Sequence, residues 1–174
     1  MKKDRHESES QDLVRVVREV KERLIGRSET LCLAESCTGG LISAAIAAEP
    51  GVSEFFRGSV VSYSGDLKVD ILNVPRSALQ VHGEVSLPVA RSMARGARAL
   101  MRSTWALSVT GIAGPTGGSA DKPVGTVCFA LVGPGIEELV GKCFVAAPSG
   151  PQRQDIQRQA GLFALELLLR QIRV

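Results

Sequence analysis

Serine, lysine and glycine supply the groups in this sequence that are best suited to chemistry, and they gather where predicted strands end. The stretch LCLAESCTGGL over Leu31–Leu41 changes from apolar residues to the small, polar run ESCTGG, and an alanine-rich segment follows. This pattern predicts a strand that leads through a tight turn into a helix. Such a turn brings unpaired backbone N–H groups close to the hydroxyl of Ser36. It suits either an anion site or a nucleophile beside an oxyanion hole.

Other groups that activate nucleophiles are scarce. The only histidines are His6, near the N-terminus, and His82, in a predicted turn. A Ser–His–Asp triad would depend on His82, which we expect to be simply exposed. The sequence has no HExxH motif and no CxxC pair, so we expect no bound metal. Its glycines match neither a Walker loop nor a dinucleotide fingerprint, so we expect no cofactor.

Lysine remains as the base for a serine nucleophile. A lysine can take that proton only where burial or neighbouring cations lower its pKa. Outside the N-terminal tail and the first helix, the lysines are Lys68, Lys122 and Lys142. Lys68 follows the second predicted strand in YSGDLK, where Tyr63 could share a proton network. If the first two strands are neighbours, Ser36, Tyr63 and Lys68 meet at one edge of the sheet. The competing interpretation of Lys68 is a solvated helical lysine.

A second glycine-rich segment, GIAGPTGGSADKPVG over Gly111–Gly125, begins at the end of another predicted strand. Glycines let backbone N–H groups approach a ligand closely. Long loops without secondary structure are often functional, and Thr110, Ser119 and Lys122 add polar contacts here. We therefore predict that this loop holds a phosphate or a carboxylate. A plain connection is the alternative.

The elements that must position these residues alternate between helix and strand. Apolar periodicity predicts helices near residues 12–25, 40–48, 68–72, 86–102 and 152–172. Strands are predicted at 31–35, 105–110, 126–132 and about 139–146, and a further strand, second in the chain, is predicted to end near residue 64. The last two strands form a hairpin. We expect a disordered tail over residues 1–9 and a single α/β domain with a mixed β-sheet over residues 10–174.

Composition and charge narrow the function classes. The 174 residues suit one domain with a full core. With no long apolar run and no secretory signal, we expect a cytoplasmic protein without a membrane partner. The cysteines should be reduced thiols. A net charge of +3 permits an anionic small molecule, and we expect no nucleic-acid partner.

Four arginines recur at helical spacing and form a stripe along one predicted helix: Arg91, Arg95, Arg98 and Arg102. We expect this stripe to be a solvated face. A subunit contact or a surface for an anionic partner are the alternatives.

Four stretches of the chain resemble the CinA C-terminal family, the nicotinamide-nucleotide amidases. They are AESCTGG (34–40), FFRGSVVSYSGDLK (55–68), VSLPVARSMARGAR (85–98) and SVTGIAGPTGGSADKPVGTV (108–127), in the family's order and spacing. The resemblance implies a three-layer α/β/α fold, a homo-oligomer and no required metal. It also implies hydrolysis of nicotinamide mononucleotide (NMN) to nicotinate mononucleotide and ammonia, a step in pyridine nucleotide recycling.

The same resemblance implies roles for individual residues. Ser36 would be the nucleophile and Lys68 its base, with Tyr63 close by. For the mechanism we further expect that backbone N–H groups around Thr38–Gly40 stabilise the oxyanion, at roughly 3–4 kcal/mol for each good donor. The Gly111–Gly125 loop would hold ribose and phosphate. The substrate-binding residues that we predict are Thr38, Gly39, Gly40, Thr110, Gly111, Gly114, Gly117, Gly118, Ser119 and Arg153.

The chain departs from the family pattern in two places near these residues. Glu84 stands where HGAVS is usual, and this extra carboxylate could alter substrate preference. Gln157 replaces the second arginine of a GDR…VR pattern, while Arg153 is kept as a phosphate ligand and Arg158 is a candidate substitute. Two alternatives therefore stay open. One is an amidase for a related amide. The other is a catalytically inactive nucleotide-binding or partner module linked to competence or the DNA damage response.

Overall fold

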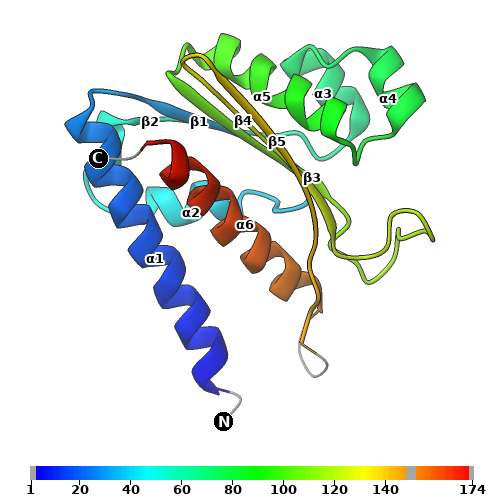
Figure 1. The fold of residues 1–174 in the computed structure, drawn as a ribbon, viewed down its shortest axis with the longest axis horizontal. Coiled ribbons are helices and arrows are strands. Elements are labelled where there is room, and N and C mark those ends of the chain that lie inside the picture. The colour runs from blue at the N-terminus through cyan, green and yellow to red at the C-terminus, as the bar shows by residue number, and fades with distance from the viewer. Residues whose placement is uncertain (1–2, 148–151, 173–174) are drawn as a thin grey trace.

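A computed structural model describes residues 3–147 and 152–172, and it contains a five-stranded mixed sheet (Figure 1). The strand order is β2-β1-β3-β4-β5. Strand β1 (Leu31–Glu35) runs parallel to β2 (Phe56–Val61) and to β3 (Trp105–Gly111). Strands β4 (Thr126–Gly133) and β5 (Ile136–Cys143) continue the sheet in antiparallel fashion.

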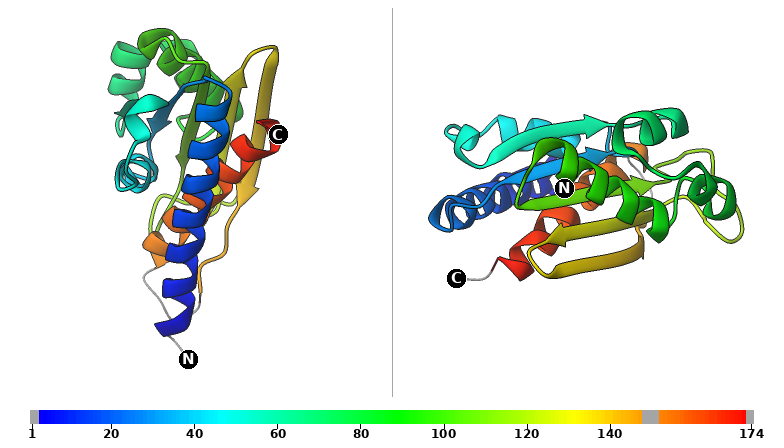
Figure 2. Two further views of the ribbon diagram at one scale, coloured as in Figure 1. Left: turned by 90° about the vertical axis from the view of Figure 1, so that its left-hand side faces the viewer. Right: turned by 90° about the horizontal axis from the view of Figure 1, so that it is seen from above.

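Helices cover both faces of this sheet, as the views in Figures 1 and 2 show. Helices α1 (Lys3–Gly26), α2 (Leu41–Ala47) and α6 (Gln152–Gln171) lie on one side. Helices α3 (Gly65–Leu72), α4 (Arg76–His82) and α5 (Leu87–Met101) lie on the other, and a single 3-10 turn spans Val52–Glu54. The expected three-layer α/β/α fold with a mixed sheet is confirmed. Within the described residues, no helix is both long and apolar enough to cross a membrane.

Successive side chains of β1 enter two separate cores. Leu31 and Leu33 belong to the core formed with α1, α2 and α6, whereas Cys32 and Ala34 belong to the core beneath α5. Strand side chains alternate between the faces, so a central strand that is covered on both sides is apolar throughout. Each fully buried leucine contributes about 1.5–3 kcal/mol. This explains why the strand at 31–35 is predicted with its observed bounds.

A close helix crossing fixes α3 against α5. A Cβ atom built on Gly96 of α5 would lie 1.9 Å from the carbonyl oxygen of Leu72, at the end of α3. Only glycine permits this approach, because the obstructing atoms belong to the backbone. The crossing matters for function because α3 carries Lys68.

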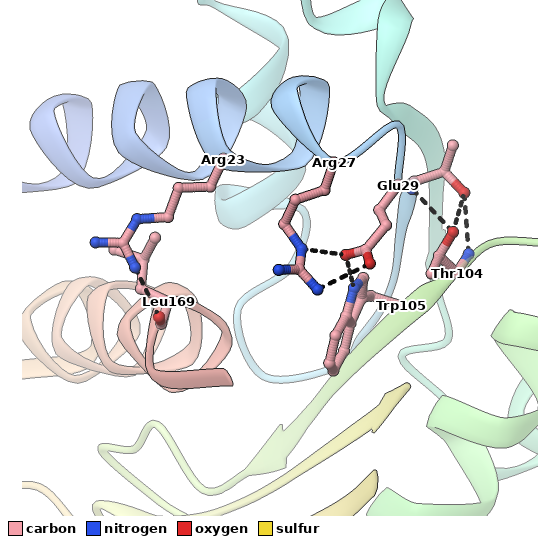
Figure 3. Close-up of polar contacts among 7 residues, drawn as sticks. Arg23, Arg27, Glu29, Thr104, Trp105 and Leu169 are labelled. Atoms are coloured by element: carbon pink, nitrogen blue, oxygen red, sulfur yellow. Dashed lines mark hydrogen bonds and ion pairs between the residues drawn. The ribbon is translucent and has the colours of Figure 1, made fainter. Parts of the chain in front are cut away.

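Polar contacts fix the turn between α1 and β1 to the start of β3 (Figure 3). The carboxylate of Glu29 accepts hydrogen bonds from the indole N–H of Trp105, at 2.7 Å, and from Arg27. The Arg27 guanidinium holds the pKa of Glu29 below its usual value. The Thr30 N–H donates to Thr104 Oγ1 at 3.1 Å. Strands β1 and β3 therefore start from a common point, which sets the relative positions of their carboxyl ends.

Some predicted elements differ from the structure. Helix α1 begins at Lys3, so residues 3–9 are helical where a disordered tail was predicted; they are rich in charged residues that tolerate a helix well. Residues 1–2 and 173–174 lie outside the described residues. Helix α4 is not predicted from the sequence, because seven residues are too few to show a clear helical period. Strand β5 begins and ends about three residues before the predicted range, since the apolar residues of this edge strand, IEELVGKC, do not alternate regularly with its polar ones.

Candidate active site

The candidate residues lie at one edge of the sheet because three parallel strands end there together. Glu35 of β1 pairs with Val61 of β2 and with Val109 of β3. Ser36 and Tyr63 follow β1 and β2, and Thr110 lies near the end of β3 itself. The expectation that the first two strands are neighbours is confirmed. Open α/β sheets bind ligands at this kind of edge.

Lys68 is fully buried, which rules out the solvated lysine that its spacing alone allowed. Its Nζ donates to Ser36 Oγ at 3.2 Å, to the Ser62 carbonyl oxygen at 2.8 Å and to Glu84 Oε2 at 2.9 Å. An ammonium has three N–H donors, and here each has an acceptor. The arrangement therefore suits a protonated lysine that is paired with a carboxylate and in contact with a serine hydroxyl.

The turn that holds Ser36 is organised by a buried carboxylate that was not among the predicted site residues. Glu35 has no exposed surface, and it accepts the backbone N–H groups of Gly40 (3.1 Å), Ile42 (3.2 Å) and Ser43 (2.9 Å). These are donors at the N-terminal end of α2, where a negative charge is favourable. An acidic residue at the end of an apolar strand, shortly before a helix, was the available signal.

This arrangement corrects the predicted oxyanion donors. The Gly40 N–H already donates to Glu35, and the Gly39 N–H donates to the Ser36 carbonyl oxygen at 3.0 Å. Thr38 differs from both glycines. Its Oγ1 is buried and lacks a hydrogen-bond partner in the part of the chain that the structure describes, and no acceptor is found there for its backbone N–H. Of the three residues predicted to donate to the oxyanion, Thr38 is the one whose backbone N–H has no acceptor among the described residues.

Cys37 adjoins Ser36 and is the other potential nucleophile in the turn. Burial raises the pKa of its thiol to about 12, so the thiol stays protonated and unreactive near neutral pH. Gln157 of α6 donates from Nε2 to the Cys37 carbonyl oxygen at 2.8 Å. Gln157, one of the two departures from the family pattern, therefore helps to hold the turn that carries Ser36.

A cavity of about 260 Å³ opens beside this turn. Glu84 and Cys37 contribute to its wall. The predicted site residues that line it are Ser36, Tyr63, Thr110, Gly111, Gly114, Gly117 and Arg153. The predicted residues that do not line it are Thr38, Gly39, Gly40, Gly118 and Ser119. Lys68 lies behind the wall, since it has no exposed surface.

Arg153 reaches the cavity from α6. Its guanidinium donates to the Gly114 carbonyl oxygen at 2.8 Å and to the Tyr63 hydroxyl oxygen. Tyr63 therefore contacts Arg153, and it is not among the hydrogen-bond partners of Lys68, contrary to the proton network that its spacing suggested. Arg158 forms an ion pair with Asp155 at 3.6 Å and does not line the cavity.

The second glycine-rich loop is fastened to the turn that carries Glu84. Lys122 Nζ donates to the carbonyl oxygens of His82 and Val85, both at 2.8 Å. Thr110 Oγ1 donates to the Glu84 carbonyl oxygen at 3.0 Å. His82 itself is exposed at the end of α4 and does not line the cavity, which leaves no triad through this histidine.

Two further predictions concern metals and the arginine stripe. No group of three or more histidine, cysteine or acidic side chains that could hold a metal ion occurs among the residues that the structure describes. Arg91 and Arg95 both pair with Glu137 of β5, and Arg98 donates to the Thr104 carbonyl oxygen at 3.1 Å. Much of the stripe is thus occupied by contacts within the chain.

Comparisons with known proteins agree with this fold. The chain is 47% identical over 146 residues to a CinA-like protein from Anaeromyxobacter sp. (strain Fw109-5), which covers 84% of this chain and 34% of that protein. It is 46% identical to a CinA-like protein from Gloeobacter violaceus, over 86% of this chain and again 34% of that protein. The chain thus spans about a third of the length of these relatives.

Solved structures match over most of their length. The competence/damage-inducible protein CihA from Agrobacterium tumefaciens has a TM-score of 0.85 at 35% identity, covering 90% of this chain and 93% of that one. A CinA superfamily protein from Klebsiella pneumoniae has a TM-score of 0.86 at 32% identity, covering 92% and 97%. The model of the CinA C-terminal domain matches residues 14–172. The chain therefore belongs to the CinA family, whose C-terminal domain it contains.

Proposed function

We propose that this domain hydrolyses the carboxamide of NMN to nicotinate mononucleotide and ammonia, with Ser36 as the nucleophile and Lys68 as its base. One observation carries the proposal: the buried Lys68 Nζ lies 3.2 Å from Ser36 Oγ, and Ser36 lines a cavity of about 260 Å³. A lysine in hydrogen-bond contact with a serine hydroxyl is an established way to activate that serine. The family resemblance supplies the substrate.

The reaction begins with a neutral Lys68. Its surplus proton passes to solvent through the cavity that Glu84, 2.9 Å away, borders. Lys68 then takes the proton of Ser36, and Oγ bonds to the amide carbon. Of the predicted oxyanion donors the Thr38 N–H is the one left, because the N–H groups of Gly39 and Gly40 already have acceptors, and it would act from behind the cavity wall, which Thr38 does not line. The C–N bond breaks, Lys68 returns the proton to the departing nitrogen, and ammonia leaves an ester on Ser36.

The charges around the cavity suit the rest of NMN. Arg153 uses two of its five N–H donors on Gly114 and Tyr63, which fixes the guanidinium at the wall and leaves donors for a phosphate. Glu84 places a carboxylate near the reacting end, where the pyridinium ring carries a positive charge. A cationic ring with an anionic tail fits this distribution better than a neutral amide does.

A catalytically inactive nucleotide-binding module is the second candidate. The Lys68–Glu84 ion pair favours it, because a lysine ammonium that donates to a carboxylate has no lone pair with which to accept a proton. Under either candidate function, sedimentation measures whether the protein forms the homo-oligomer that the resemblance implies.

The experiment incubates the purified protein with NMN and quantifies ammonia and nicotinate mononucleotide by chromatography, beside Ser36→Ala and Lys68→Ala. The proposal expects both products in equal amounts from the wild type and background levels from the two variants. Calorimetric binding of NMN to a wild-type protein that releases no ammonia would support the binding module in place of the amidase.

A further inference from the structure

Glu84 is the member of the Lys68–Glu84 pair that faces the cavity. The Lys68 side chain has no exposed surface, whereas 49% of the Glu84 side chain is exposed and the residue lines the cavity wall. A water molecule that enters the cavity can therefore contact the Glu84 carboxylate without displacing any protein group. Reaching Lys68 would require a path past Ser36 or Glu84.

The distances place this carboxylate one water molecule away from the nucleophile. Lys68 Nζ lies 3.2 Å from Ser36 Oγ and 2.9 Å from Glu84 Oε2. Because two N–H bonds of one ammonium diverge at roughly the tetrahedral angle, the two oxygens are about 5 Å apart. A single water can bridge such a gap with two hydrogen bonds of about 2.8 Å. A general base acts within hydrogen-bond reach or through such a water.

Several contacts hold Glu84 in this position. The Thr110 hydroxyl donates to its carbonyl oxygen, and Lys122 donates to the carbonyl oxygen of the following residue, Val85. The side chain packs over Gly65 at the start of α3, where an added Cβ would lie 3.1 Å from Glu84 Oε1. Glu84 Oε2 is fixed by Lys68. The carboxylate is therefore oriented, despite being half exposed.

We propose that Glu84 is the general base of the second half of the reaction, in which water hydrolyses the ester on Ser36. The inference rests on the proposed amidase function. Once Ser36 carries an acyl group, that group lies between the cavity and the buried Lys68, so the incoming water meets Glu84 instead. A serine–lysine pair that uses a separate glutamate to activate the deacylating water is a workable combination, as in class A β-lactamases.

The proton path follows hydrogen bonds present in the structure. Glu84 takes a proton from the water, the water oxygen bonds to the acyl carbon, and the bond from that carbon to Ser36 Oγ breaks. Glu84 passes its proton to the neutral Lys68 amine, and the resulting ammonium protonates the departing Oγ at 3.2 Å. Ser36, Lys68 and Glu84 return to their starting forms. The product is the free acid, which ionises to nicotinate mononucleotide.

The test separates the two half-reactions in Glu84→Gln, whose amide keeps the size and the oxygen acceptor of the side chain but cannot take a proton. Enzyme is mixed with excess NMN, and ammonia is followed by rapid quench. We expect a burst of about one ammonia per site, then a steady rate about 10²- to 10⁴-fold below the wild type. Intact-mass analysis should find the acyl group on the variant, at Ser36. Hydroxylamine, which attacks esters without a base, should restore turnover and yield a hydroxamate.

Glu137→Gln is the matched control, because Glu137 is a carboxylate on β5 that pairs with Arg91 and Arg95 and does not line the cavity. It should behave as the wild type does. If Glu84→Gln does not fold, Glu84→Asp carries the same test, with a base retained at a greater distance and a smaller burst.

Two results would overturn the role of Glu84 while leaving the amidase intact: wild-type turnover in Glu84→Gln without an adduct, or loss of the first ammonia together with the steady rate. Absence of ammonia release by the wild type would instead overturn the amidase, and this inference with it.

Discussion

The Lys68 ammonium contacts Ser36 Oγ at 3.2 Å across 32 positions of the sequence, and three features of the fold bring the two together. The parallel pairing of β1 and β2 aligns their carboxyl ends. Glu35 fixes the turn after β1, and the crossing of α3 over Gly96 fixes the helix that carries Lys68. Each feature can be perturbed separately.

Replacing Lys68 by methionine should separate catalysis from stability. Methionine has a similar shape and needs no acceptors, and the Glu84 carboxylate that loses its partner is half exposed, so water can solvate it. We expect kcat/KM for NMN to fall by about 10²- to 10⁴-fold, while the midpoint of thermal unfolding stays within a few degrees of the wild type. Steady-state kinetics and calorimetry measure both. A variant that keeps wild-type kcat/KM would show that Lys68 is not the base.

Cys37 should be dispensable and unreactive. Because burial raises the pKa of its thiol to about 12, only about one molecule in 10⁴ is a thiolate at pH 8. We expect iodoacetamide at pH 8 to label the exposed Cys143 and to leave Cys37 unmodified, as read by peptide mass spectrometry. Cys37→Ala should keep at least a tenth of the wild-type activity. Rapid labelling of Cys37 with loss of activity would point to the thiol as the nucleophile.

Gly96→Ala should destabilise the protein and lower its activity together. The new Cβ would lie 1.9 Å from the Leu72 carbonyl oxygen, so α3 must move and take Lys68 with it. Overpacking of this kind costs about 1–3 kcal/mol or more in the free energy of unfolding. Urea denaturation measures the loss. Gly141→Ala is the control, since a Cβ on this β5 glycine meets no atom within 4 Å, and its effect should stay within about 0.5 kcal/mol.

The contribution of Glu29 should depend on pH in a defined direction. Its pKa is lowered in the folded state, chiefly by the hydrogen bond from Arg27. A carboxyl group with a lowered pKa stabilises the fold above its unfolded value, which is near 4.5, and this stabilisation is lost as pH falls through the folded value. Glu29→Gln should therefore be less stable than the wild type at pH 7, by up to about 1 kcal/mol. At pH 3 the difference, measured by urea denaturation, should be smaller. An equal difference at both pH values would contradict this account.

The sequence predicts the framework well because strong local signals specify it. The strand at 31–35 is apolar on both faces, and the helix behind Ser86 has a clear period, so both are found close to their observed bounds. Lys68 emerges by elimination, since few other bases are available. Its burial does not emerge, because a lysine in a short helix is usually exposed.

The finer features of the site depend on contacts that no local pattern shows. Glu84 reaches Lys68 only because α4 folds back between them, and α4 itself was missed. The use of the Gly40 N–H by Glu35 depends on how tightly the turn closes. Gly118 and Ser119 were expected at the ligand because of their types, yet Ser119 bonds to the Lys122 N–H within its own loop.

The central claim is that Ser36 is the nucleophile of an NMN amidase, and the comparison of kcat/KM between the wild type and Ser36→Ala tests it most directly. Alanine removes only Oγ and leaves the turn, the cavity and Glu35 in place. The account predicts measurable formation of nicotinate mononucleotide by the wild type and a loss of at least about 10³-fold in the variant. Equal rates in the two proteins would contradict it.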